Sequence, residues 1–322
     1  MRDGGPAFRQ CLTSVREQVD PPLELIVVDD GSIDGSGPAA EALGARVLRQ
    51  DHPLGPARAR NAGAALATGD ILVFIDADVE LHADTLARFR RRFEADPGLD
   101  AVCGRYDNDP AARAFVSRYR NLVHAYTHLM ATGPAGTFWA GCGAIRRQVF
   151  EAAGGFDPRF TTPSVEDIEL GMRLARLGRS LAIDGSIQVK HHKRWTLWSM
   201  IRTDVWLRAV PWSHLMMADR KAPASLNLRW SQRASVAAAL LWPAALLLDP
   251  AAALALLAAH AGLNLPFLGF LRRTQGLLFA IGSWPLHVLH HFYSGAALPL
   301  AIAAFPWRQL AQPVPTLEEG SE

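Results

Sequence analysis

Two acidic residues one position apart follow an apolar run in this chain of 322 residues. In the stretch FIDADVE, Asp76 and Asp78 come directly after DILVFI, a run that is typical of a buried strand. Alternate side chains of an extended segment project from the same face, so the two carboxylates would lie together. Two such oxygen donors suit a hard divalent cation, Mg²⁺ or Mn²⁺, which would also hold phosphate oxygens. The alternative is a solvated strand end in which aspartate forms a turn.

Two further acidic pairs occur in the sequence. Asp29 and Asp30 follow the apolar run LELIVV, and a carboxylate can accept hydrogen bonds from a base N–H or from ribose hydroxyls. Glu166 and Asp167 lie in the first turn of an amphipathic helix predicted over residues 164–178. The helix dipole alone would favour acids there, but a positioned carboxylate can also act as a general base.

The elements that position these acids alternate along the chain. We expect strands over residues 23–30, 45–50, 70–75 and 99–106, and helices over residues 38–44, 57–69 and 83–95. Continuous apolar runs are typical of strands covered on both faces, and the alternation predicts an α/β fold with a doubly wound, mostly parallel sheet. Ligands of such sheets bind outside the carboxyl ends of the strands. The acids of VVDDGS and FIDAD both lie at that position.

Glycines and aromatic residues mark a third place where a ligand could be approached. In WAGCGAIRRQVF, Gly141 permits close approach of the backbone to a ligand, and Trp139 offers a stacking face. A tight turn packed under the sheet explains the same residues. Further along, His191 and His192 follow another predicted strand. Adjacent residues of an extended chain point in opposite directions, so only one of these histidines can face the site.

Four segments of the chain closely resemble inverting glycosyltransferases of family 2. They are LELIVVDDGSIDGS, GPARARNAGAALATGDILVFIDADVELHADTL, GCGAIRRQVFEAAGGFD and EDIELGMRLARLG, and they occur in the order typical of the family. The resemblance covers roughly residues 7–195. It implies a GT-A fold with a doubly wound mixed sheet, a nucleotide-sugar donor and a divalent cation as cofactor.

The resemblance also implies roles for individual residues. Those that match the surroundings of the nucleotide and the donor sugar are Asp29, Asp30, Arg58, Asn61, Asp76, Gly141 and Glu166. Asp78 matches the direct metal ligand, and a histidine, for which His191 is favoured over His192, would be a further contact of the metal or the diphosphate. Asp167 matches the general base that removes the proton of the acceptor hydroxyl, with inversion at the anomeric carbon.

The start of the chain departs from the family pattern. Members begin with a strand of the type VSVVIPxYN, which forms one wall of the nucleotide pocket, whereas this chain begins with MRDGGPAFRQCL. We therefore expect the sheet to lack its first strand, through a start codon assigned too late or through truncation. Deleting a central strand leaves the edge of its neighbour unpaired. This predicts poor stability and weak donor binding relative to an upstream-extended form.

The last third of the chain contains long apolar segments. They cover residues 234–248, 251–271 and 277–305. The second and third reach about 20 residues, the length of a transmembrane helix, and Asp249 and Pro250 separate the first from the second. Two or three membrane spans are both compatible with the sequence, and the distribution of arginines favours three.

The predicted organisation has four parts. These are a GT-A catalytic domain over residues 1–195, amphipathic interfacial helices or a linker over 196–233, transmembrane helices over 234–305 and a disordered tail over 306–322. The second part would lie on lipid headgroups or dock on the catalytic domain. We expect a multi-pass protein of the cell (inner) membrane with its catalytic domain on the cytoplasmic side.

These features predict a metal-dependent glycosyltransferase of the hexosyltransferase type. It would move a sugar from a nucleotide-sugar donor to the hydroxyl of a lipid or lipid-linked acceptor at the cytoplasmic membrane face. A net charge of +2 without a basic tract argues against a nucleic-acid partner. Two alternatives stay open: a processive polysaccharide synthase, disfavoured because Gln188 and Arg194 are wrongly spaced for a Q-x-x-R-W signature, and an inactive membrane scaffold that retains the fold.

Overall fold

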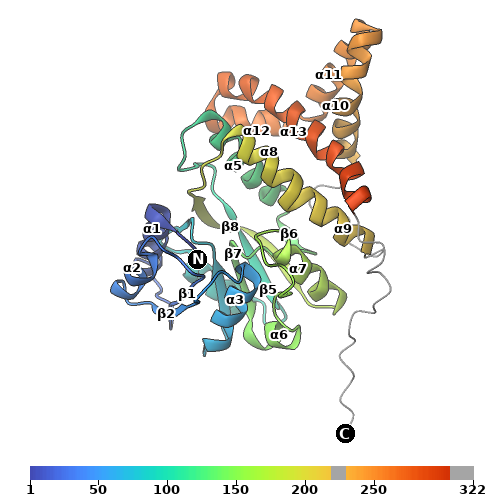
Figure 1. Ribbon diagram of the computed structural model, residues 1–322. Coiled ribbons are helices and arrows are strands. Elements are labelled where there is room, and N and C mark those ends of the chain that lie inside the picture. The colour runs from blue at the N-terminus through green and yellow to red at the C-terminus, as the bar shows by residue number, and fades with distance from the viewer. Residues whose placement is uncertain (219–229, 305–322) are drawn as a thin grey trace.

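The computed structural model describes residues 1–218 and 230–304. The tail over residues 306–322, predicted to be disordered, lies outside the described residues. Figure 1 shows an α/β part that contains the N-terminus and a group of longer helices packed above it.

The first part of the chain forms a small parallel sheet with two helices. Its elements are α1 (Gly5–Arg16), β1 (Ile26–Asp29), α2 (Ser36–Ala42) and β2 (Arg46–Arg49). Along the edge of β1 that faces away from β2, the amine of Met1 donates to the carbonyl of Val28 at 2.5 Å, and the carbonyl of Met1 accepts from the amide of Asp30 at 2.8 Å. Among the described residues, this two-stranded sheet shares no strand pairing with the larger sheet.

The larger sheet has six strands and is mixed. They are β3 (Ile71–Ile75), β4 (Val79–Leu81), β5 (Ala101–Tyr106), β6 (Gly133–Pro134), β7 (Cys142–Arg146) and β8 (Leu181–His191). Their order is β3-β7-β5-β8-β4, with β6 pairing beside β8. Only the β5–β8 pair is parallel among the described pairs of this sheet. The alternation of elements alone predicts a mostly parallel sheet, which is wrong here, because the connection over residues 107–141 begins and ends at the same end of the sheet.

Helices cover both faces of this sheet. They are α3 (Pro56–Leu66), α4 (Thr85–Ala95), α6 (Arg147–Ala152) and α7 (Glu166–Arg176). On one face, Phe74 of β3 packs edge-on against Phe156 with ring centres 5.2 Å apart, within a buried cluster that includes residues of α3, α6 and α7. On the other face, Phe89 and Phe93 of α4 pack in a second buried cluster. The two clusters hold the strand ends that carry the predicted acids.

The remaining helices form one body with α5 of the α/β part. They are α5 (Phe115–Met130), α8 (Leu197–Arg202), the π-helix η1 (Thr203–Ala209), α9 (Val210–Ala218), α10 (Trp230–Leu248), α11 (Pro250–Leu263), α12 (Leu265–Gln275) and α13 (Leu277–Ala304). A single apolar cluster contains Tyr119 of α5, Met200 of α8, Phe267 of α12 and Phe279 of α13. In Figure 1, α12 and α13 lie above α5, and α10 and α11 project from the top as a hairpin.

One helix of the described residues, α10, is long and apolar enough to cross a membrane. The predicted span over residues 251–271 is not a straight helix, because α11 and α12 meet at an angle of 63°. The break follows from Pro266, which has no amide hydrogen and disfavours a helical conformation of the residue before it. Together the bent pair could form one broken span or a re-entrant loop.

The histidines of α13 face the interior of the helical body. His287 Nδ1 lies 2.9 Å from the hydroxyl of Tyr119 on α5, and its Nε2 lies 3.1 Å from Asn264 Oδ1. His291 Nδ1 lies 2.9 Å from His260 Nε2 on α11. Buried polar groups require such partners, so these residues join the helices to one another.

Candidate active site

An arginine joins two of the predicted acids. The guanidinium of Arg60, on α3, donates to Asp76 Oδ1 at 2.8 Å and to Glu166 Oε1 at 2.7 Å. Asp76 follows β3 and Glu166 begins α7, so these ion pairs bring a strand end and a helix start together. Burial would lower the pKa of Arg60, but the charges of Asp76, Glu166 and Asp167 outweigh burial and raise that pKa. The sequence analysis did not single out Arg60.

Arg58 and Asn61 do not join this cluster. Arg58 donates to the carbonyl of Pro158 at an exposed position. The side chain of Asn61 exchanges two hydrogen bonds with the backbone of Phe156 and so holds a loop. In the sequence ARARN, two arginines stand two positions apart, and residues with that spacing lie on nearly opposite sides of a helix. The rotation of α3 about its own axis therefore determines that Arg60, and not Arg58, faces Asp76 and Glu166.

Asp78 and His191 face each other beside β4 and β8. Asp78 Oδ2 lies 3.6 Å from His191 Nε2. The other ring nitrogen of His191, Nδ1, lies 2.8 Å from Asn121 Oδ1, which also accepts from the indole N–H of Trp195. An indole nitrogen can only donate, so Asn121 presents its oxygen to both rings. His191 therefore carries its proton on Nδ1.

This arrangement leaves an electron pair on Nε2 of His191. Burial lowers the pKa of His191, so the neutral ring has no proton on Nε2 to share with the carboxylate of Asp78. Two electron-pair donors at this separation form a donor set that fits a divalent cation. Among the described residues, no group of three or more His, Cys, Asp or Glu side chains gathers, so ligand phosphates or water would complete the coordination.

His192 points elsewhere. Its Nε2 lies 2.6 Å from Glu80 Oε2. Because β4 and β8 are antiparallel with Val79 opposite His191, the neighbouring side chains of His192 and Glu80 lie together on the other face. Of the two adjacent histidines, the structure brings His191 to Asp78.

Asp29 and Asp30 play different structural roles at the end of β1. The carboxylate of Asp30 accepts from the amides of Leu54 and Gly55 at 2.7 and 3.0 Å, which fixes the loop before α3. Asp29 Oδ1 accepts from the amide of Ser32 at 2.8 Å, whereas Oδ2 of Asp29 is buried without a partner among the described residues. An unbonded buried acceptor is costly. This oxygen faces α2, because a Cβ atom at Gly37 would come within 2.5 Å of it.

Asp167 is half-buried at the start of α7. Its Oδ2 accepts from the amide of Ala140 at 3.2 Å, and its Oδ1 accepts from the amide of Ile168 at 2.8 Å. Burial, followed by the charge of Glu166, raises the pKa of Asp167 to about 7, against the opposing charge of Arg60. A carboxylate with a pKa near neutrality suits the work of a general base.

Gly141 lies under the ring of Trp139. A Cβ atom at Gly141 would come within 2.6 Å of that ring, and its carbonyl accepts from the amide of Asp76 at 3.2 Å. The ring of Trp139 in turn packs edge-on against Tyr106 with centres 4.7 Å apart. The need to pack Trp139 accounts for glycine at this position without a ligand.

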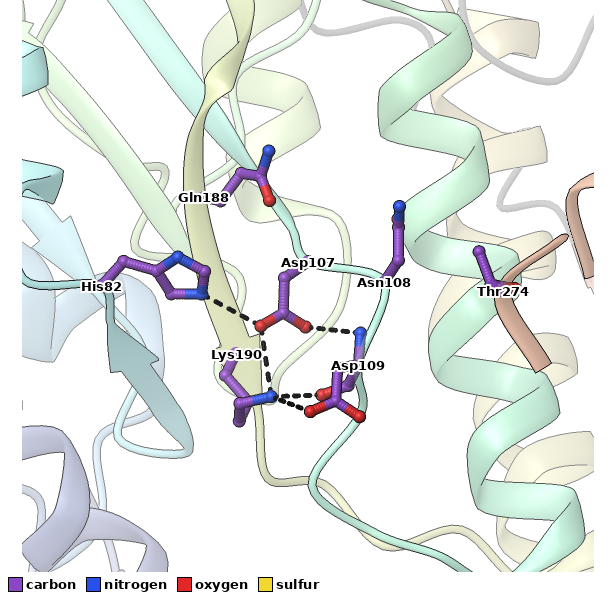
Figure 2. Close-up of a pocket in the computed structure, with 7 residues that line it drawn as sticks. All are labelled: His82, Asp107, Asn108, Asp109, Gln188, Lys190 and Thr274. Carbon is purple, nitrogen blue, oxygen red and sulfur yellow. Dashed lines mark hydrogen bonds and ion pairs between the residues drawn. The ribbon is translucent and has the colours of Figure 1, made fainter.

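A cavity of about 490 Å³ lies on the other face of β8 (Figure 2). Lys190 Nζ lies 3.3 Å from Asp107 Oδ2 and 2.9 Å from Asp109 Oδ2, and His82 Nε2 lies 3.0 Å from Asp107 Oδ2. The charges of this cavity are therefore paired with one another. None of the predicted site residues lines it.

The fold and these side-chain contacts together define a class of protein. A mixed α/β sheet carries Asp76, Asp78 and His191 at its strand ends, and Arg60 ties this group to the helix that begins with Glu166 and Asp167. Such a site can hold a metal-bound anion beside a carboxylate base. These are the features of a GT-A-like domain with a helical C-terminal region.

Comparison with known proteins agrees with this class. Residues 3–154 match Glycosyl transferase family 2. The pre-mycofactocin glycosyltransferase of Mycobacterium tuberculosis is 30% identical over 203 residues, which cover 60% of this chain and 42% of that protein. The O-antigen chain rhamnosyltransferase RfbN of Salmonella typhimurium is 26% identical, over 60% of this chain and 65% of that protein. This chain thus spans less than two thirds of either relative.

A solved structure extends the likeness into the helical region. The mannosyltransferase PcManGT from Pyrobaculum calidifontis, in complex with GDP-Man and Mn²⁺, matches with a TM-score of 0.60 at 24% identity. The match covers 90% of this chain and 85% of that protein, and it shows the fold. Residues 3–154 of this chain are thus similar to glycosyltransferase family 2, and the α/β part has a GT-A-like mixed sheet.

Proposed function

We propose that this protein is an inverting, metal-dependent glycosyltransferase that moves a sugar from a nucleotide-sugar donor to the hydroxyl of a lipid or lipid-linked acceptor at the cytoplasmic face of a membrane. One observation carries the proposal. Arg60 binds both Asp76 and Glu166, so the acids after β3 and the base Asp167 at the start of α7 lie on one structural unit.

The donor would lie along the strand ends. Asp29 and Asp30, at the end of β1, would lie beside the nucleoside, where a carboxylate can accept hydrogen bonds from a base N–H or from ribose hydroxyls. Asp78 and His191 would hold a divalent cation, which would supply neutralisation of the charge that develops on the leaving diphosphate. The relative PcManGT was solved with GDP-Man and Mn²⁺, which supports a nucleotide-sugar donor and a divalent cation for this chain.

Asp167 would act on the acceptor. Its ionised carboxylate would take the proton of the acceptor hydroxyl as that oxygen attacks the anomeric carbon. Attack from the face opposite the leaving diphosphate inverts the anomeric configuration. The amide of Ala140, which donates to Asp167 Oδ2, would hold the carboxylate in place.

The helical region supports an acceptor at a membrane. Trp198 of α8 and Trp206 of η1 expose 73% and 54% of their surface, and such tryptophans suit the headgroup level of a bilayer. The helix α10 is apolar enough to span the bilayer and exposes Leu247 and Leu248. Anchoring by these elements would place the site next to the membrane surface.

A donor screen tests the proposal. The full chain in detergent is given a panel of nucleotide sugars, Mn²⁺ or Mg²⁺, and membrane lipid extract, and release of nucleoside diphosphate is measured. Turnover should require the cation and should fall by about 10²–10⁴-fold in Asp167→Asn. The matched control is Asp184→Asn, which changes a carboxylate remote from the site. Turnover retained in Asp167→Asn, or no turnover of any donor, would contradict the proposal.

A further inference from the structure

The π-helix η1 carries a cation toward the base Asp167. The hydroxyl of Ser164, three residues before Asp167, donates to the carbonyl of Leu207 at 3.1 Å, so η1 is docked on the segment that leads into α7. The next residue, Arg208, donates to His124 Nε2 on α5. Arg208 therefore lies between the start of α7 and α5. π-helical turns are rare and often occur at functional sites.

Aromatic rings lie between Arg208 and the proposed cation site. His191, the partner of Asp78, stacks on Tyr106 with ring centres 4.2 Å apart. Tyr106 in turn stacks with His124, with centres 6.0 Å apart, and His124 is the group that Arg208 contacts. The guanidinium of Arg208 is thus separated from Asp78 by these rings, and it is close enough to Asp167 for that carboxylate to raise its pKa, against the larger effect of burial.

The positive charge of Arg208 is poorly compensated within the described part of the chain. Its ion-pair partner, Asp204, lies 3.9 Å away. That carboxylate is already engaged by Arg120, at 2.5 and 3.1 Å, and by the hydroxyl of Tyr293 at 2.6 Å. Burial, followed by the charge of Arg120, lowers the pKa of Arg208. A cation that is crowded in this way is stabilised by an additional anion.

The side chain of Arg208 is nevertheless partly exposed. The side chain of Arg208 is 39% exposed, compared with 5% for that of Asp204. A planar guanidinium with free N–H groups suits bidentate binding of a phosphate.

We infer that Arg208 binds a phosphate group carried by the acceptor, and that it thereby positions the acceptor hydroxyl against Asp167. The acceptor would be a phosphate-bearing lipid. This inference rests on the proposed function for the identity of the acceptor as a substrate. The binding of phosphate by Arg208 can be measured independently of turnover.

A binding experiment tests the inference. The full chain in neutral detergent is titrated with dodecyl phosphate, with dodecanol as the uncharged match and with inorganic phosphate as the free anion. Wild type should bind dodecyl phosphate, and Arg208→Gln should weaken that binding by about ten- to a hundredfold, the worth of a charged hydrogen bond. Arg208→Lys should restore part of it. Arg202→Gln, an exposed arginine at the end of α8, should bind like wild type.

The outcomes separate the two proposals. Binding of dodecyl phosphate that is unchanged in Arg208→Gln, or an equal loss for dodecanol, overturns the inference even when nucleotide sugars are turned over. Binding of inorganic phosphate as tightly as dodecyl phosphate, with the same dependence on Arg208, supports the phosphate site and assigns it to a soluble phosphate ester. If the chain binds phosphate through Arg208 but turns over no donor, this result contradicts the proposed function and leaves the inference about Arg208 intact. Thermal unfolding of each variant shows whether Arg208→Gln remains folded.

Discussion

At the residue scale, the charge environment of Asp167 would set the pH range in which the proposed site is active. Burial and Glu166 raise its pKa to about 7, and a general base must be ionised to take a proton. Activity should therefore rise with pH through about 7. Glu166 raises the pKa of Asp167 and Arg60 lowers it. A substitution at either residue should therefore shift the pH range over which activity rises, the acid limb of the pH profile.

The first prediction concerns that limb. Glu166→Gln removes a negative neighbour of Asp167, so the pKa of Asp167 should fall and the acid limb of kcat/KM should move to lower pH. A profile of kcat/KM against pH checks this. Glu169→Gln, on the same helix and paired with Arg173, should leave the limb in place. A limb that moves to higher pH would contradict the assignment of Asp167 as the base.

The second prediction compares two neighbouring arginines. Arg60→Ala leaves the carboxylate of Glu166, whose side chain is 5% exposed, without its partner, and breaking a buried pair costs about 3 kcal/mol of the free energy of unfolding. Arg58→Ala removes one exposed contact and should change stability by less than about 0.5 kcal/mol. Denaturant unfolding of both variants measures the difference, and equal effects would show that Arg60 has no central role.

The types of residue and their order along the sequence predicted much of the candidate site, because strand ends and helix starts are marked by a change from apolar to polar residues. Asp76, Asp78 and Asp167 stand at such boundaries. Arg60 could not be separated from Arg58, since their positions around the helix depend on how α3 packs on the sheet. His191 could be preferred to His192 only through the family resemblance, because the contact of its Nε2 with Asp78 Oδ2 forms only in the folded chain.

At the scale of elements, helix α7 must approach the chain before β7 very closely. A Cβ atom at Gly171 would come within 2.0 Å of the backbone nitrogen of Phe138. Two residues later, Ala140 donates its amide to Asp167. The close approach of α7 therefore sets the position of the base.

The third prediction follows from this contact. Gly171→Ala should push α7 away from residues 137–140, lower the free energy of unfolding by about 1–3 kcal/mol as overpacking does, and reduce turnover through Asp167. Gly262→Ala is the control, because a Cβ atom there meets no atom within 4 Å. Thermal unfolding and turnover are measured on both. Normal turnover in Gly171→Ala would show that the base tolerates movement of the helix.

The positions of the strands along the chain could be predicted from the sequence more readily than the directions in which they run within the sheet. The predicted strands over residues 70–75 and 99–106 agree with β3 and β5 within two residues. The antiparallel course of β7 could not be predicted, because it depends on which end of the sheet the preceding connection returns to. The apolar run over residues 251–271 hid the break between α11 and α12, since mean hydropathy does not register the effect of one proline on the backbone.

At the scale of the whole molecule, the helical region and the α/β part share a polar centre. Asp204 of η1 binds Arg120 of α5 and Tyr293 of α13. Three segments far apart in sequence thus meet at one buried carboxylate, surrounded by the apolar cluster of α5, α8, α12 and α13. The sequence indicated that apolar helices follow the α/β part, but not which of their faces meet it, because that depends on side chains brought together only by folding.

The fourth prediction tests this centre. Asp204→Asn removes the charge that compensates Arg120, so the free energy of unfolding should fall by about 3–5 kcal/mol, as for other broken buried pairs. Asp109→Asn, whose side chain is 60% exposed, should cost less than about 1 kcal/mol. Thermal unfolding in detergent measures both. A small effect of Asp204→Asn would mean that other contacts hold the two parts together.

The hydrogen bonds inside the helical body also set an order for its assembly during synthesis. Asn264 can bond Ser235 through its amide nitrogen as soon as α10 and α11 exist, but its oxygen and the ring of His260 must wait for His287 and His291 of α13. The hairpin of α10 and α11 therefore leaves the ribosome with polar groups still unmatched. Completion of the final helix closes the bundle, so a nascent chain halted before α13 would be a natural target for quality-control proteases.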